Sequence, residues 1–164
     1  MKFIAMLLML FPLAASATDV EYLMIKMMQP KIATMKKVGN IEGMAKYIKQ
    51  LEIDIREKLS TVESNANWGF LVIAVRNDGK IKAWLDSDDE VPPTLSKMMT
   101  SMAETRSGFP VKDGAVVFAL GYGINGAPLP TEKMPFPVEW KKTSGCNNED
   151  CQGVDVEEVV LKSW

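Results

Sequence analysis

The chain has 164 residues, with 19 Lys and Arg against 21 Asp and Glu, a net charge of −2, and no histidine. Recognition of nucleic acid depends on clustered positive charge, so this balance argues against a nucleic-acid partner. The absence of histidine excludes Ser-His-Asp and Cys-His catalysis, and also zinc bound through histidine. We therefore expect a protein that is not an enzyme and that has no cofactor and no metal site.

The N-terminal segment has the pattern of a secretory signal peptide. Met1-Lys2 is a short basic start, Phe3 to Ala15 is an apolar run, and Ala15-Ser16-Ala17 is a small-x-small cleavage site. The apolar run is too short to span a bilayer, which takes about 20 residues. We expect residues 1–17 to be removed by cleavage after Ala17, leaving a periplasmic protein of residues 18–164 with one domain and no membrane span.

Residues 18–65 are predicted to form a helical hairpin. Val20, Leu23, Met24, Met27 and Met28 recur at the three- and four-residue spacing of an amphipathic helix. Pro30 predicts a kink or break after this stretch. A second stripe runs from Ile41 to Val62 and predicts the clearest helix of the chain, with Asn40 as its N-cap.

Residues 66–126 are predicted to form a small sheet with a crossing helix. Phe70 to Val75 is a continuous apolar run, typical of a strand buried on both faces. Asn77-Asp78-Gly79 predicts a hairpin turn, and a half-exposed strand follows over residues 81–85.

A third helix is predicted after Pro92-Pro93, with Leu95, Met98, Met99 and Met102 as its buried stripe. A long strand follows from Ala115 to Ile124. The expected fold class is α+β, with the helical hairpin packed against a small antiparallel sheet in β-β-α-β order.

Residues 127–164 are predicted to form a proline-rich extended tail with a local disulfide. Cys146 and Cys151 are the only cysteines, and their C-x4-C spacing does not match a redox C-x-x-C motif, so a structural disulfide is expected. The periodicity of Val154 to Leu161 leaves open an edge strand or a last helical turn. Trp164 is expected to pack or to bind something.

Residues 68–126 resemble the periplasmic C-terminal domain of TonB-type energy transducers and the related TolA domain. The matching features are Val72 to Val75 with Asp78-Gly79, the helix from Leu95 to Met102, and Phe109-Pro110 before the last strand. The resemblance implies a helix lying across a small antiparallel sheet, and a partner that binds by adding a strand to an exposed sheet edge. Such transducers also keep an uncleaved membrane helix and a long proline-rich spacer, which this sequence lacks.

The resemblance places the binding edge at Ala115 to Tyr122. The candidate residues there are Val117, Ala119, Gly121 and Tyr122, and the two glycines at 121 and 123 would allow close approach of a partner backbone. Trp84 joins this site if it is exposed on the polar face of its strand, while cover by the hairpin or by the C-terminal segment is the alternative. The expected partner is an envelope protein or a peptide, and the oligomeric state is left open.

Three other chemistries remain as alternatives. Met24, Met27 and Met28, with Met98, Met99 and Met102, could make Met-rich helical faces that carry copper(I) or another small ligand, although core packing explains the same pattern. The acidic run 86–90 could hold Ca²⁺, or supply a carboxylate pair for acid-base chemistry. A solvated loop before a helix is the preferred interpretation of that run.

Overall fold

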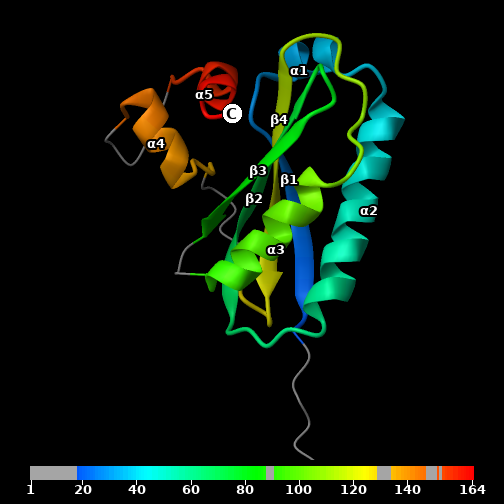
Figure 1. Ribbon diagram of the computed structural model, residues 1–164, viewed down its shortest axis with the longest axis vertical. Coiled ribbons are helices and arrows are strands. Elements are labelled where there is room, and N and C mark those ends of the chain that lie inside the picture. Colours follow the sequence, from blue (N-terminus) through cyan, green and yellow to red (C-terminus); the bar gives the residue numbers. More distant parts are fainter. Residues whose placement is uncertain (1–17, 88–90, 129–133, 147–150, 152) are drawn as a thin grey trace, which may run out of the picture.

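A computed structural model describes residues 18–87, 91–128, 134–146, 151 and 153–164. The fold is α+β, as expected: an antiparallel sheet of four strands in the order β1-β4-β2-β3, with helices on both faces (Figure 1). The described elements are, in chain order, β1 (Val20–Met27), α1 (Lys31–Lys37), α2 (Ile41–Leu59), β2 (Asn67–Arg76), β3 (Ile81–Ser87), α3 (Pro93–Glu104), β4 (Ala115–Ile124), α4 (Val138–Ser144) and α5 (Val156–Lys162).

The two central strands are β2 and β4. Every residue of β4 is buried, and so is almost every residue of β2, which explains why both sequences are continuously apolar. Val72 in β2 lies between Ala119 of β4 and Trp84 of β3. The predicted hairpin turn joins β2 to β3, and Gly79 adopts a φ of 82°, which glycine allows without steric cost.

The first face of the sheet is covered by α2 and α3. Asn40 caps α2 as predicted, since its side-chain oxygen accepts from the backbone N–H of Gly43 at 3.1 Å. The stripe of α2, with Leu51 and Ile55 at its centre, packs on Phe118 and its neighbours in the sheet. Tyr47 adds a hydrogen bond of 3.0 Å to the carbonyl of Ala103 in α3, which ties the two helices together.

The second face is covered by the C-terminal part of the chain, and here the expected extended tail is wrong. Residues 138–144 and 156–162 are helices, and the open alternative for Val154 to Leu161 is settled as a helix with Asp155 as its N-cap. Trp140 of α4 is fully buried and stacks edge-on against Trp84, with ring centroids 5.3 Å apart. Trp164 packs under the guanidinium of Arg76 at 4.5 Å.

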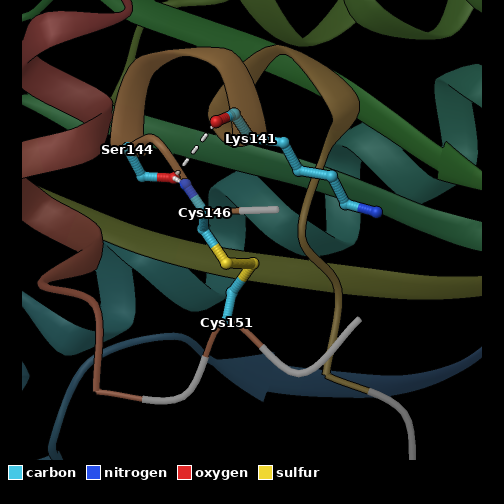
Figure 2. Close-up of a disulfide and its surroundings, with 4 residues drawn as sticks. All are labelled: Lys141, Ser144, Cys146 and Cys151. Atoms are coloured by element: carbon cyan, nitrogen blue, oxygen red, sulfur yellow. Dashed lines mark hydrogen bonds between the residues drawn. A yellow bond between two sulfur atoms is a disulfide. The ribbon is translucent and has the colours of Figure 1, made fainter. Parts of the chain in front are cut away.

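Cys146 and Cys151 form the expected disulfide, which follows α4 (Figure 2). The backbone N–H of Cys146 donates to Oγ of Ser144, the last residue of α4, at 3.3 Å, so the first cysteine of the disulfide is held close to the end of that helix. Gly145 ends α4 in the left-handed conformation, with a φ of 68°. The disulfide closes a short local loop and does not connect the sheet to its helices.

Residues 20–28 are a strand followed by a turn and not the first helix of a hairpin, so the hairpin prediction is wrong. The pairing of β1 with β4 shifts register between Tyr22 and Met24, which marks a β-bulge. Tyr22 and Met27 therefore pack on the first face, whereas Met24 and Met28 pack on the second. Because both faces are covered and the bulge resets the alternation, the apolar spacing imitates that of a helix.

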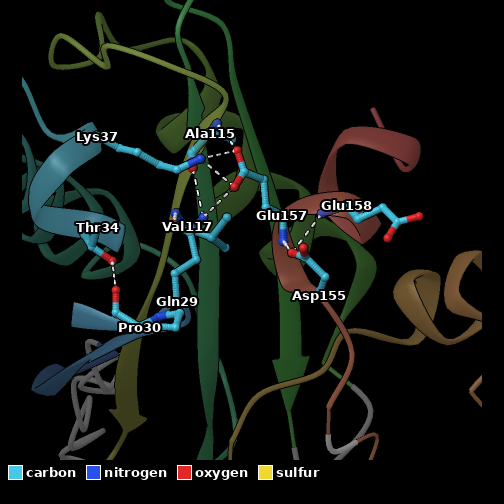
Figure 3. A network of polar contacts seen from close by, with 9 residues as sticks. All are labelled: Gln29, Pro30, Thr34, Lys37, Ala115, Val117, Asp155, Glu157 and Glu158. Atoms are coloured by element: carbon cyan, nitrogen blue, oxygen red, sulfur yellow. Dashed lines mark hydrogen bonds and ion pairs between the residues drawn. The ribbon is translucent and has the colours of Figure 1, made fainter. Parts of the chain in front are cut away.

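A polar joint fastens α5 to the start of β4 (Figure 3). Glu157 binds Lys37 of α1 at 2.5 Å and accepts the backbone N–H of Ala115 at 3.0 Å. The amide of Gln29 donates to the carbonyl of Ala115 and accepts from the N–H of Val117, each at 3.0 Å. Gly114 lies so close that a Cβ there would stand 1.8 Å from the Glu157 carboxylate.

In the part of the chain that the structure describes, no helix is long and apolar enough to cross a membrane. The signal peptide predicted for residues 1–17 lies outside the described residues.

Candidate functional site

The predicted binding edge at Ala115 to Tyr122 is not an edge. β4 lies between β1 and β2, and Val117, Ala119 and Tyr122 are fully buried. Gly121 pairs with Met24 on one side and with Phe70 on the other, so no incoming strand can reach it. The error follows from β1, because a segment read as a helix cannot be expected to cover the neighbouring strand.

Trp84 is also unavailable to a partner. Its side chain is 5% exposed, and Trp140 of the C-terminal segment covers it. Of the two alternatives that the sequence leaves open, cover by the C-terminal segment is the one observed. The predicted site residues of β4 thus lie inside the sheet, Trp84 lies on its outer strand β3 under the C-terminal segment, and all of them are buried.

The two outer strands of the described sheet are β3 and β1, and other elements contact β3 at two points. A carboxylate oxygen of Glu104 in α3 accepts the backbone N–H of Ala83 at 3.0 Å. Asp86 accepts the backbone N–H of Phe136 at 2.8 Å, which holds the chain ahead of α4 against the end of the same strand. The Glu104 carboxylate takes one backbone donor of β3 that a partner strand would otherwise use.

The second half of β1, the other outer strand, has backbone groups that point away from the sheet. The backbone N–H of Met28 donates to the carbonyl of Val117 at 3.1 Å, on the β4 side. Backbone groups in an antiparallel pair alternate in direction, so those of Met27 and Ile25 point away from β4. They face the side on which the described sheet has no further strand.

An apolar groove runs beside this part of β1. It has a volume of about 570 Å³ and lies between β1 and the first half of α2. Ile25 of β1 and Ile41 of α2 are 52% and 62% exposed, which is high for large apolar side chains. The groove is lined by Ile25, Met27, Ile41, Met44, Ala45, Ile48, Lys49 and Glu52.

Charged groups mark the polar end of the groove. Partial burial raises the pKa of Glu52 above its ordinary value of 4.5, and nearby Arg56 opposes this shift. The Nε of Arg56 donates to the carbonyl of Val20 at 3.0 Å, so α2 closes the edge at the start of β1. The open part of the edge is therefore restricted to the residues that follow the bulge.

The other face of the same segment is filled by Lys26. Its ammonium group lies 5.2 Å from the centre of the Phe70 ring, and burial lowers the pKa of this lysine from 10.5. A partner strand beside β1 would thus have an apolar groove on one face and a lysine stem over an aromatic ring on the other. This arrangement suits binding of a backbone with apolar side chains.

The alternative sites receive little support from the geometry. Met24 and Met28 lie on the opposite side of the sheet from Met27, so the first of the two expected Met-rich helical faces does not exist. The acidic run 86–90 is described only at Asp86 and Ser87, and its other residues lie outside the described part. Among the described residues, no three His, Cys, Asp or Glu side chains gather closely enough to hold a metal ion.

Comparison with known proteins gives no relative: no family model, no curated protein and no solved structure matches the chain. Function is therefore inferred from the geometry of β1 and its groove. The sequence signal that could have found this site is the run Met24 to Met28, whose apolar residues exceed what one face of an edge strand requires.

Proposed function

We propose that this protein is a secreted, periplasmic binding protein without enzymatic activity, which holds an extended segment of a protein or peptide partner as an added strand on β1. The observation that supports the proposal most directly is the open edge at Ile25 and Met27 beside an apolar groove. Strand addition supplies affinity through backbone hydrogen bonds and specificity through pockets for alternate side chains.

The geometry limits the partner to a short segment. The bulge and the contact of Arg56 with Val20 disfavour pairing with the first residues of β1. The regular part, Met24 to Met27, has room for a partner strand of about four residues at 3.3 Å per residue. Side chains of the partner alternate between faces, so every second one would enter the groove, and these should be apolar.

The signal-peptide pattern and the resemblance to TonB-type domains agree with this proposal, since both imply a role in the cell envelope. The edge proposed here differs from the one that the resemblance suggested. It is on β1, the strand that the resemblance does not include.

Panning of random displayed peptides on the mature chain tests the proposal. We expect enriched peptides with apolar residues at every second position. Binding of a selected peptide should slow hydrogen exchange at the amides of Ile25 and Met27, which point to the open side. An enriched peptide that left these two amides unprotected would contradict the proposed site.

Two variants and a matched control make the test specific. Ile25→Pro removes one outward donor without touching a bond to β4, and we expect about tenfold weaker binding by calorimetry, the equivalent of one hydrogen bond. Ile25→Asp places a charge in the groove and should abolish binding. Ile53→Asp changes a side chain of α2 that is 43% exposed and does not line the groove, so its affinity should stay that of the wild type.

A further inference from the structure

Positive charge is concentrated in one part of the chain. Six lysines and one glutamate lie between residues 26 and 49, so this segment has a net charge of +5 in a chain whose total is −2. The segment comprises the end of β1, α1 and the first half of α2, which meet at one end of the molecule, at the top of Figure 1. The rest of the chain therefore has a net charge of −7, from a total of −2 and +5 in this segment.

Exposed apolar side chains gather at the same end. Eight large apolar side chains are exposed among the described residues, and four of them lie between residues 25 and 41. Ile32 and Met35 in α1 are 72% and 55% exposed, and Ile41 begins α2. A short helix that presents two such side chains to solvent has no explanation in the core of this protein.

Exposed lysines surround these side chains. We define the α1 surface as Lys31, Ile32, Met35, Lys36 and Ile41, together with Lys112, whose backbone N–H donates to the carbonyl of Lys37 at 2.8 Å. Lys37 itself is engaged with Glu157 and is not included. Glu42 and Asp113 are exposed acids at this end, so the three lysines of the surface exceed these two carboxylates by one charge.

From this combination we infer that the α1 surface binds the anionic surface of a lipid bilayer. Apolar side chains with a rim of lysines match the boundary between the headgroups and the acyl chains of a bilayer. The apolar side chains enter this boundary, and the lysines contact the anionic headgroups. An acidic protein would be attracted by the lysines alone and gives no reason for the exposure of Ile32 and Met35. The α1 surface shares Ile41 with the groove beside β1, but its lysines, Ile32 and Met35 do not line that groove, and the inference does not depend on the peptide proposal.

Co-sedimentation with vesicles tests the inference. We expect the mature chain to bind vesicles of phosphatidylglycerol and phosphatidylcholine at low salt, to be released as salt rises, and not to bind vesicles of phosphatidylcholine alone. Lys31→Glu with Lys36→Glu should lower the partition coefficient at least about twenty-five-fold, about fivefold for each lysine lost. Ile32→Ser with Met35→Ser should lower it as well, because insertion needs the apolar side chains.

Lys141→Glu with Lys142→Glu is the matched control, since these two lysines are exposed in α4 on the far part of the chain. It makes the same change of net charge and should leave vesicle binding within about twofold, because attraction to a surface is short-ranged in salt. Equal losses in the control and in the α1 variant would overturn the inference, as would unchanged binding after Ile32→Ser with Met35→Ser.

Two further outcomes distinguish membrane binding from binding of an acidic protein and from the proposed peptide binding. Binding to polyglutamate that depends on Lys31 and Lys36, without binding to anionic vesicles, would overturn it in favour of an acidic protein partner. Ile25→Pro should retain vesicle binding while it loses peptide binding, so failure of one proposal can be told from failure of the other.

Discussion

The two faces of the sheet are covered by parts of the chain that are held in different ways. On the first face, α2 and α3 bury a continuous apolar cluster around Leu51, Met99 and Phe118. On the second face, two helices of seven residues cover a smaller cluster centred on Trp140, and a polar joint at Glu157 ties them to the sheet. Short helices are marginal alone, so the second layer depends on a few contacts, whereas the first is supported along a whole helix.

The largest effect is expected at Trp140, on which the second layer is centred. Trp140→Ala should lower the free energy of unfolding by about 3–5 kcal/mol, because it leaves a cavity between Trp84 and Phe136. The loss of the second layer should also uncover Trp84, seen as a red shift of tryptophan fluorescence before global unfolding in urea. A variant that unfolds in one transition at all probes would show that the two layers form a single cooperative unit.

Leu51→Ala is the substitution on the first face that corresponds to Trp140→Ala on the second. Leu51 is fully buried in the centre of α2, and the substitution should cost about 2–5 kcal/mol. Here the fluorescence of Trp84 and the helical circular dichroism should change together, since α2 covers the sheet along its whole length. Separate transitions for this variant would contradict the contrast between the faces.

A smaller effect is expected from the polar joint. Glu157→Gln keeps the shape of the side chain but removes the ionic contact with Lys37, and should cost about 1–3 kcal/mol. Glu158→Gln is the control in the next residue, where the pair with Lys162 is exposed and one helical turn apart, and it should cost no more than about 0.5 kcal/mol. Equal effects in urea titrations would show that the joint does not hold α5.

The smallest effects are pH-dependent and of opposite sign in two places. The pKa of Asp78 lies at about 2 because Arg76 binds its carboxylate, so its contribution to stability is present above about pH 4 and is lost as the pH falls toward 2. The pKa of Glu52, on the first face, is raised by burial, so the folded state binds this proton more readily and stability falls as the pH rises through its pKa. NMR titration of the two side-chain carboxyl carbons checks that the pKa of Asp78 lies below that of Glu52. Glu52→Gln should remove the fall in stability that accompanies deprotonation of Glu52.

The elements that could be predicted from the sequence are those whose residues keep the same pattern of burial along their length, or whose turn is set by local residues. The predicted start of the second helix at Ile41 is that of α2, with its cap at Asn40, and the predicted strand from Ala115 to Ile124 coincides with β4. The Asn77-Asp78-Gly79 turn is local chemistry and needs no knowledge of the rest of the fold. The helices after residue 137 were missed because seven residues are too few for periodicity to distinguish a helix from an extended segment.

The candidate site could not be predicted for a different reason. Whether a strand lies at an edge is decided by its neighbours, and pairing between distant segments leaves no mark in a single sequence. One bulge in β1 concealed a strand, and this in turn made β4 look like an edge. Of the groove residues, the apolar spacing assigns Met27 and Ile41 to the buried stripes of two helices and assigns Ile25 to neither, although Ile41 is in fact largely exposed.

The pairing of β1 with β4 has a consequence for the order in which the chain becomes structured. Val20 and Ile124 are neighbours in the sheet but stand more than one hundred residues apart in the sequence. A chain that emerges from a ribosome with its N-terminus first presents β1 long before its partner exists. During that interval the mostly apolar residues from Met24 to Met28 have no strand to pair with, so we expect this segment to be a point of contact for a chaperone.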